Sequence, residues 1–542
     1  MVTNNTALPQ LAGALSEQHR NDPSDSIKEL TMKPLTSASA NEIWPRTDSS
    51  RLALKPLAAA LLGATLLTAC GGDDDNPAAI ENGDFVGNWI SAEDGQALKV
   101  ESNKVTSYQY TAGHCLIDQS TTGNQADLGK QGWTLNTDNT SLTLKTNHLG
   151  TSYIDISYQK ADELPAQCAD DKLLTQYFED DFEADPARDY QIFWDTFNEY
   201  YPSFARRGVD WETINSTYSG QISNDMSEPE FFQVLAQMVQ PLQDSHISLE
   251  NGDAEASFMR GETFDDRLLA EFLESDQVDG AIDTDAEYQA YMAYIGTQYQ
   301  LMNEIRTSYA TNDIQQAAND ELLWYKVEQD GSSVGVLIIN AMDGFLEDAD
   351  EAENLAEIKA DMDALETAIV QVLTDLKDTE GLIIDLRDNP GGHDVNSQVL
   401  VRHFLDTERT LYSKQSRLGN DRTDLEVIRL SPAELTYTKP VVILTSPMTE
   451  SAAEVFTMAM SALPHVTVLG ERSQGALADT LEKQLPDGTN FTLVNEYYLS
   501  SDGDWYEGQG IPVAAEIPFM TLEEREEEED LGLETAWEAI TE

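Results

Sequence analysis

Three uninterrupted apolar runs in the C-terminal half of this 542-residue chain constrain its fold most strongly. They are short, rich in β-branched residues and bounded by turn residues: Gly381–Leu386, Val441–Thr445 and Val466–Leu469. A strand without polar alternation is buried on both faces, as in a parallel sheet covered by helices. Apolar residues spaced by three and four between Leu355 and Leu373 predict an amphipathic helix before the first run. The sequence therefore predicts an α/β core.

The segments around this core differ in kind. Residues 81–168 hold short runs of β-branched and aromatic residues between Gly, Asn and Asp, which predicts a small all-β domain, a sandwich or a barrel. Residues 171–330 carry apolar stripes at helical spacing, which predicts a helical subdomain, with residues 251–320 as an acidic insertion or lid. The core is expected over residues 331–520, followed by an acidic C-terminal helix over 521–542 whose charged residues face solvent.

Charge excludes one large class of partner. The chain has 98 acidic and 32 basic residues, a formal net charge of −66. Such a surface repels phosphate backbones, so we expect no nucleic-acid partner. The apolar fraction of 40% is enough for a sizeable core and excludes a wholly disordered chain. The acidity indicates solubility, as in a salty habitat. We expect no cofactor and no metal.

A leader is predicted at the N-terminus. Arg51 and Lys55 precede the apolar stretch Pro56–Ala69, which is too short to span a bilayer comfortably. A basic segment followed by a short apolar one is typical of a signal peptide. The alternative is a buried helix followed by a chance cysteine, Cys70. We expect residues 1–70 to be the leader.

The end of the apolar stretch reads Leu67-Thr68-Ala69-Cys70. This pattern resembles the lipobox of bacterial lipoproteins, which implies that Cys70 is lipidated and becomes the first residue of the mature chain. Residues 71–80 would then be a polar tether. The expected location is the bacterial cell envelope, with the protein facing the periplasm or the cell surface. Gly71 and Gly72, in place of an inner-membrane retention Asp, favour the outer membrane.

Two cysteines remain after the leader, Cys115 and Cys168. An even pair in an oxidising compartment predicts a disulfide bond. The alternative is two free buried thiols.

Two turns at the ends of predicted strands carry candidate chemistry. Pro390-Gly391-Gly392 follows the first buried run, and its glycines allow backbone amides to point at a developing oxyanion. Ser451 follows the second run and precedes a helix that begins at Ala452. A serine there gains from the helix dipole, and the Ala452 amide can bind an oxyanion. The alternative is structural, because Ser451 and Glu454 also match a helix capping box.

These motifs occur in one order: Pro390-Gly391-Gly392, Ser451-Ala452-Ala453-Glu454, Gly470-Glu471, Leu485-Pro486-Asp487-Gly488 and Glu507-Gly508-Gln509-Gly510-Ile511-Pro512. The order resembles the C-terminal-processing (tail-specific) serine peptidase family and its tricorn-core relatives. The resemblance implies a crotonase-like or ClpP-like αβ core with Ser451 as the nucleophile. It also implies an oxyanion hole made by the amide of Gly391 or Gly392 and that of Ala452.

The general base separates two branches of this family. The C-terminal-processing branch carries a lysine shortly after its Gly-Glu pair, but here Ala476 holds that position. Lys483, seven residues further on, falls in a predicted strand. A Ser–Lys dyad is therefore not expected.

The tricorn-like branch uses a histidine directly preceded by serine. Ser245-His246 matches this pattern where a helix is predicted to end and a strand to begin. Glu507 matches the glutamate that orients the histidine side in that branch. The resemblance therefore implies a catalytic set of Ser451, His246, Glu507 and Ser245. His393, just past the oxyanion glycines, is the rival base.

The expected function is that of a lipid-anchored serine endopeptidase acting on flexible polypeptides or protein C-termini. No PDZ-like segment is found between His246 and the strands near residue 335, so tail-specificity has less support than proteolysis. Two other classes stay open. One is a non-catalytic surface binding lipoprotein that kept the fold. The other is a crotonase-like acyl-CoA enzyme, which export to the envelope disfavours because CoA substrates are cytosolic.

We predict that Cys70→Ser leaves the protein unprocessed or without lipid, because the thiol is the acceptor in the lipobox resemblance. Mass spectrometry of the mature N-terminus measures this. A mature N-terminus at another residue in the wild-type protein would contradict the prediction.

Overall fold

The computed structural model describes residues 83–129, 131–148, 151–252, 254–346 and 355–542. The lipobox and Cys70 lie outside these ranges. Within them, no helix combines the length and the apolar character needed to cross a membrane. The α-helices are α2 (Pro186–Tyr200), α3 (Trp211–Tyr218), α4 (Glu228–Val239), α5 (Phe264–Glu274), α6 (Asp285–Ser308), α7 (Leu355–Asp375), α8 (Asp394–Arg402), α9 (Ala452–Ser461), α10 (Leu522–Glu527) and α11 (Leu531–Thr541).

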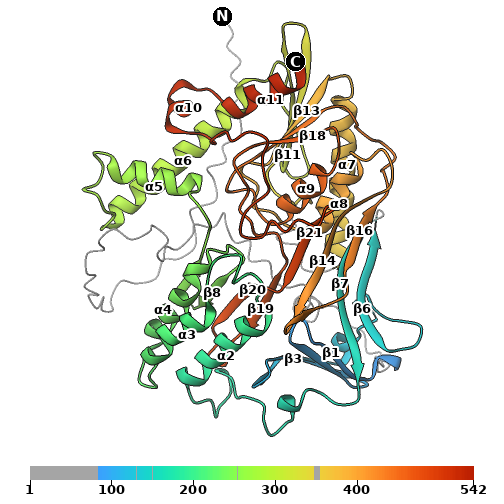
Figure 1. The fold of residues 1–542 in the computed structure, drawn as a ribbon, viewed down its shortest axis with the longest axis vertical. Coiled ribbons are helices and arrows are strands. Elements are labelled where there is room, and N and C mark those ends of the chain that lie inside the picture. Colours follow the sequence, from blue (N-terminus) through green and yellow to red (C-terminus); the bar gives the residue numbers. More distant parts are fainter. Residues whose placement is uncertain (1–82, 130, 149–150, 253, 347–354) are drawn as a thin grey trace, which may run out of the picture. The chain divides into compact units, whose positions relative to one another are not determined.

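A six-stranded sheet in the order β10-β11-β12-β13-β17-β18 forms the centre of the C-terminal half (Figure 1). Its strands are β10 (Gln315–Ala317), β11 (Leu322–Gln329), β12 (Ser332–Ile339), β13 (Gly381–Asp385), β17 (Val441–Thr445) and β18 (Val466–Gly470). The last four strands of this order run parallel. The three apolar runs of the sequence are thus three neighbouring parallel strands, and the predicted α/β fold class is confirmed.

Both faces of this sheet are covered, which explains why the runs are mostly apolar. Leu382 and Ile384 belong to the apolar cluster that includes the buried faces of α7, α8 and α9. Ile383, between them, belongs to a second cluster with Leu533 and Ala536 of α11. Successive side chains of a strand point to opposite faces, so each must be apolar here. Because β13 and β17 are parallel neighbours, their carboxyl ends meet at one edge of the sheet.

The N-terminal domain is one antiparallel sheet of seven strands, in the order β4-β3-β2-β1-β7-β6-β5. The strands are β1 (Gly87–Ser91), β2 (Gln96–Val100), β3 (Lys104–Tyr110), β4 (Cys115–Thr122), β5 (Trp133–Leu135), β6 (Ser141–His148) and β7 (Thr151–Ala161). The expected all-β character is present, but a single sheet replaces the two facing sheets of a sandwich. The second half of β4 alternates between exposed and half-buried residues, so this strand has no apolar pattern that would predict it.

A disulfide bond joins Cys115, the first residue of β4, to Cys168 in the short turn of helix η3 (Ala166–Cys168). Both cysteines are buried beside Ala97 and Tyr108 of the seven-stranded sheet. The bond fastens the segment that follows β7 to the edge strand of the sheet.

A third sheet, in the order β19-β20-β8-β9, connects the helical subdomain to the C-terminal half. Its strands are β8 (Ser248–Asn251), β9 (Ala254–Ser257), β19 (Thr480–Gln484) and β20 (Asn490–Val494). The aromatic stripe of α2 is core, as predicted: Phe193 and Phe197 are fully buried and contact Phe491 of β20. Pairing of β8 with β20 brings His246, just before β8, toward the core.

A fourth sheet contains β14 (Arg409–Leu418), β15 (Asp421–Arg422), β16 (Glu426–Leu430) and β21 (Glu496–Ser500). The remaining short turns are η1 (Gly83–Phe85), η2 (Gly123–Ala126), η4 (Ser219–Gln221) and η5 (Gln240–Leu242).

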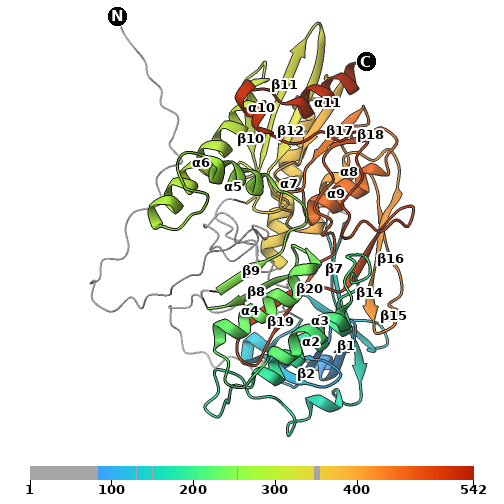
Figure 2. The same cartoon turned by 60° about the vertical axis from the view of Figure 1, so that its left-hand side comes forward.

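The acidic insertion contains α5 and α6, which pack on each other and beside α10 (Figure 2). Arg306 of α6 is buried and pairs with Asp385 at the end of β13, 2.9 Å away. The same carboxylate pairs with Arg387, which also binds Asp530 at 2.7 Å. These pairs fasten both the insertion and the C-terminus to the edge of the sheet where β13 ends.

The prediction of a solvent-facing acidic C-terminal helix is wrong in part. The segment forms two helices, α10 and α11, and two of its acidic residues are buried. Glu524 caps α10 by accepting hydrogen bonds from the amide and hydroxyl of Thr521. Asp530 caps α11 and pairs with Arg387. A charge run does not tell which of its members has a buried arginine as a partner.

We predict that alkylation of the unfolded, unreduced protein labels neither Cys115 nor Cys168. Replacing both by serine should lower the free energy of unfolding by about 4 kcal/mol, because the bond closes a loop across a separation of 53 residues. Peptide mass spectrometry and denaturant unfolding measure these effects. Full labelling of both thiols would contradict the disulfide.

Candidate active site

Ser451 lies between the end of β17 and the start of α9, and its side chain is not used for structure. It is the N-cap residue of α9, yet its hydroxyl forms no capping hydrogen bond. Its backbone has φ 54° and ψ −125°, a region that costs a non-glycine residue about 1–3 kcal/mol. Such strain clusters at functional sites, where the surrounding structure holds a side chain in an unusual direction. The residue is only 7% exposed.

The capping-box alternative for Ser451 is wrong. In a capping box the N3 glutamate would return to the Ser451 amide, but that amide donates to the Ala476 carbonyl at 3.0 Å. The Glu454 carboxylate accepts instead from the Ser473 hydroxyl at 2.6 Å and from the amides of Gly475 and Ala476 at 2.7 and 2.8 Å. Burial raises the pKa of Glu454 to about 7. Glu454 thus organises a neighbouring turn, and Ser451 is left for another use.

The glycine turn after β13 packs directly against Ser451. The Gly391 amide donates to Asn389 Oδ1 at 2.9 Å, so it is already engaged. The Gly392 and Ala452 amides have no acceptor within the described ranges. Of the two glycines expected as oxyanion donors, Gly392 is therefore the free one. Gly391 serves by being small, because a Cβ there would lie 2.6 Å from Ser451 Cβ.

Glu507 is fully buried and holds the next part of the same turn. Its Oε2 accepts from the amides of Leu477 and Ala478 at 3.0 and 3.4 Å. Its Oε1 accepts from Arg207 at 2.8 Å. Burial, followed by the charge of Asp244, raises the pKa of Glu507 to about 8.

His246 is 6% exposed, and no hydrogen bond of its ring is found in the described structure. Its Nδ1 and the Ser245 hydroxyl are buried without a partner there. Its backbone amide donates to Asp244 Oδ1 at 3.1 Å. Burial lowers the pKa of His246 below its usual value, while the carboxylates of Asp244 and Glu454 oppose this shift. The imidazole is therefore neutral near pH 7, the state a general base requires.

The four predicted residues are brought into one region, but they are not joined directly. No hydrogen bond links Ser451 to His246, or Glu507 to either Ser245 or His246, among the described residues. Glu507 instead reaches the histidine loop through Arg207, which pairs with Asp244 at 3.0 Å. Glu507, expected to orient the histidine side, thus reaches that side through a bridge and not by direct contact.

The two rival bases have different surroundings. Burial lowers the pKa of His393 to about 4, and its ring also forms no hydrogen bond within the described part of the chain. Lys483 lies on β19, and its ammonium group donates to the carbonyls of Asp94 and Gly95 in the seven-stranded sheet, at 2.6 and 3.4 Å. Burial lowers the pKa of Lys483 to about 8. Lys483 therefore fastens the N-terminal domain to the third sheet.

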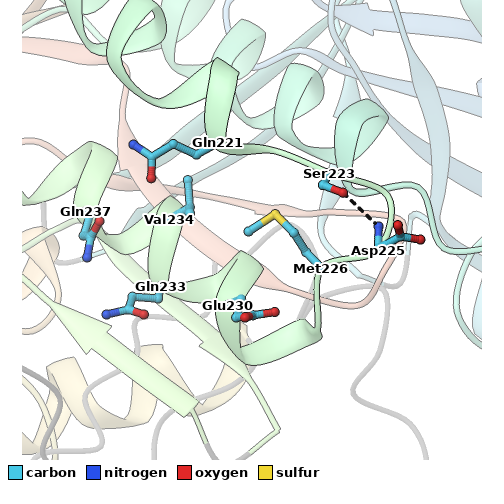
Figure 3. Close-up of a pocket in the computed structure, with 8 residues that line it drawn as sticks. All are labelled: Gln221, Ser223, Asp225, Met226, Glu230, Gln233, Val234 and Gln237. Carbon is cyan, nitrogen blue, oxygen red and sulfur yellow. Dashed lines mark hydrogen bonds between the residues drawn. The ribbon is translucent and has the colours of Figure 1, made fainter. Parts of the chain in front are cut away.

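A hollow of about 440 Å³ lies beside α4, away from these residues (Figure 3). Glutamines and acidic residues line much of it, including Gln221, Gln233 and Glu230, and it contains no nucleophile with an adjacent base. Nor do the described ranges contain three His, Cys, Asp or Glu side chains grouped to hold a metal ion.

Sequence reasoning missed three residues that shape the site: Arg207, Asp244 and Asn389. Signals for two of them were present. Arg206 and Arg207 are adjacent arginines in a chain with few basic residues, and Asp244 stands two residues before His246. Nothing local marks Asn389, whose amide group bonds to the Ile339 carbonyl fifty residues away.

A strained serine at the head of a helix, next to two free backbone amides, defines the site as one of the serine-hydrolase type. Comparisons with known proteins agree. Residues 333–517 match the model of Peptidase family S41, and residues 182–240 match that of the tricorn protease C1 domain. Residues 333–517 therefore form a Peptidase S41 domain, and the resemblance to the tail-specific serine peptidase family is confirmed.

Two relatives come from Bacillus subtilis (strain 168). The carboxy-terminal processing protease CtpA is 28% identical over 164 residues, which cover 29% of this chain and 34% of the relative. CtpB is 30% identical over 137 residues, which cover 25% and 27%. This chain thus matches about a third or less of each. The crystal structure of a candidate peptidase from Parabacteroides merdae ATCC 43184 shares the fold, with a TM-score of 0.51 at 21% identity, over 66% of this chain and 98% of that one.

We predict that Gly391→Ala lowers the rate of labelling by a small fluorophosphonate about 10²-fold, because the new methyl group displaces Ser451. Gly503→Ala is the matched control. Its φ is +86° against +99° at Gly391, but nothing lies within 4 Å of a Cβ at Gly503. Both alanines bear a similar backbone cost of about 1–2 kcal/mol. Equal labelling of the two variants would contradict the proposed packing.

Proposed function

We propose that this chain is a serine endopeptidase of the bacterial cell envelope, anchored to the outer membrane through a lipid on Cys70, with Ser451 as nucleophile and His246 as base. The observation that carries the proposal is the state of Ser451: an uncapped hydroxyl on a strained backbone beside two free amides. The Peptidase S41 match supports the reaction class, and the tricorn C1 match supports the histidine branch. Flexible polypeptides or protein C-termini are the proposed substrates, in keeping with the carboxy-terminal processing relatives.

The proposed reaction proceeds through an acyl-enzyme. The Ser451 hydroxyl attacks the substrate carbonyl carbon while its proton passes to the neutral imidazole of His246. The carbonyl oxygen becomes an oxyanion that accepts from the amides of Gly392 and Ala452. Collapse expels the amine, which takes the proton from His246. Water then repeats both steps on the ester, releasing the new carboxyl terminus and Ser451. The hydrogen bond between Ser451 and His246 forms with substrate bound, as catalytic hydrogen bonds often tighten only then.

One observation favours a second candidate, a binding lipoprotein without activity. No hydrogen bond joins Ser451 to His246 or to His393 in the described structure, so the nucleophile has no base in contact. A serine-reactive fluorophosphonate separates the two functions, because a protein without an activated serine does not react.

We predict that His246→Ala lowers kcat by about 10³–10⁶-fold, and that adding Ser451→Ala makes it hardly worse, because the two act as a unit. Glu507→Gln should lower kcat less. Hydrolysis of unfolded protein substrates and fluorophosphonate labelling measure these effects. As the control, Lys483→Met should retain most activity, because its ammonium group binds carbonyls of the N-terminal domain. If His393→Ala is inactive and His246→Ala is not, the base is His393.

The same assignment predicts the pH dependence. Since burial holds the pKa of His246 below its usual 6.5, the base stays neutral at pH 7 and gains a proton only on further acidification. We therefore expect kcat/KM to be level near pH 7 and to fall below pH 6.5, with the acidic limb lost in His246→Ala. A limb that persists in that variant would exclude His246 as the titrating base.

A further inference from the structure

Arg207 bridges the two halves of the candidate site. It lies in the turn between α2 and α3, and its side chain is 3% exposed. On the histidine side it donates to the carbonyls of Leu242 and Gln243, at 3.2 and 2.6 Å. On the serine side it donates to the Gly475 carbonyl at 3.0 Å and to Glu507 at 2.8 Å. One rigid guanidinium thus connects segments more than 200 residues apart in the sequence.

The loop before His246 depends on this guanidinium. Gln243 has a left-handed backbone with φ 47° and ψ 52°, uncommon for a residue with a side chain, and its carbonyl is held by Arg207. Asp244 is fully buried and pairs with Arg207, while its other oxygen receives the His246 amide. The position of His246 therefore follows from the position of Arg207.

The buried acidic side chains around the site also depend on Arg207. Asp244 and Glu507 are both fully buried, and Arg207 is the one cation paired with either of them in the described ranges. Losing the guanidinium would leave Asp244 as an unpaired buried charge, which is strongly unfavourable, and would leave a buried Glu507 oxygen without its donor. A lysine keeps the charge but lacks the planar fork that spans both partners.

Resting on the function proposed above, we propose that Arg207 is a positioning residue, which sets the distance between the His246 loop and the turn that supports Ser451. It touches neither substrate nor reacting atoms. Its effect passes through Asp244 on one side and through Glu507 and the Gly475 carbonyl on the other.

Besides any effect on stability, the charge of Arg207 affects the pKa of His246. The charged groups that face His246 are Asp244, Glu454, Asp479 and Arg207, and of these only Arg207 lowers the pKa of the imidazole. Removing the guanidinium charge therefore moves the pKa of His246 upward. A residue that only stabilised the fold would leave the acidic limb of the pH profile where it is.

We expect Arg207→Lys to fold and to lower kcat about 10²-fold with KM within about threefold, as for a misplaced catalytic group. Arg207→Met should lower the rate further and move the acidic limb of kcat/KM to higher pH. If Arg207→Met does not fold, the kcat and KM of Arg207→Lys decide alone. A kcat of Arg207→Lys within about threefold of wild type, with the fold intact, overturns the proposal.

Arg525 provides the matched control. Its side chain is 2% exposed, close to the 3% of the Arg207 side chain, and its fork joins α10 to Gln298 of α6 and Glu271 of α5. Arg525→Lys should lower the melting temperature comparably but leave kcat within about twofold. An equal loss of kcat in both lysine variants means a structural role only, and overturns the proposal. Ser451→Ala tests the proposed function separately, because a Ser451→Ala variant that still hydrolyses substrate refutes that function. If Ser451→Ala is inactive and Arg207→Lys is fully active, only the positioning role is refuted.

Discussion

The geometry of the candidate site depends on one turn, residues 473–478, which is held by the buried side chains of Glu454 and Glu507. Residues 473–478 pass between Glu454 and Glu507, which together accept five hydrogen bonds from that segment. The same turn returns the Ala476 carbonyl to the Ser451 amide. The backbone strain at Ser451 is maintained because its neighbour cannot move without breaking bonds to a buried carboxylate. A turn that supplies none of the proposed catalytic side chains thus holds the backbone of Ser451, the proposed nucleophile, in place.

This arrangement explains what Ala476 does at the position where the C-terminal-processing branch has a lysine. At position 476 the chain uses the backbone of an alanine, whose amide binds Glu454 and whose carbonyl binds Ser451. Ala476 is 1% exposed, so the position has no room for a solvated ammonium group. In the proposed mechanism the base, His246, therefore comes from another part of the fold. The third sheet supplies that connection, because β20 pairs with the strand that follows His246.

The sequence predicted the core well because a strand covered on both faces leaves a local pattern. The runs ending near Leu386, Thr445 and Leu469 needed no information beyond their own residues. For the site, local sequence marked only candidates at strand ends, Ser451 and the glycines. The family resemblance was needed to choose between catalysis and capping and to add His246 and Glu507. The contacts that the sequence did not predict join residues far apart in the chain or depend on which amide a side chain occupies. The partner of Glu507 is Arg207, 300 residues earlier, and the free amide is that of Gly392 because Asn389 occupies the other. The buried Asp530 has a distant partner too, Arg387, whereas β4 lacks a local signal because its second half has no apolar pattern.

Because basic residues are scarce in this chain, the few buried arginines are important for the stability of the fold. With 98 acidic and 32 basic residues, the chain has about three carboxylates for each cation, and their mutual repulsion opposes folding. The side chains of Arg207, Arg306 and Arg387 are nevertheless inside. Arg207 and Arg387 each pair with two buried carboxylates from different segments, and Arg306 pairs with Asp385. Salt screens the exposed repulsion far more than it screens these buried pairs. Rising ionic strength therefore removes the unfavourable charge term and leaves the favourable one, so the acidic surface and the buried arginines together suit the fold to salty surroundings.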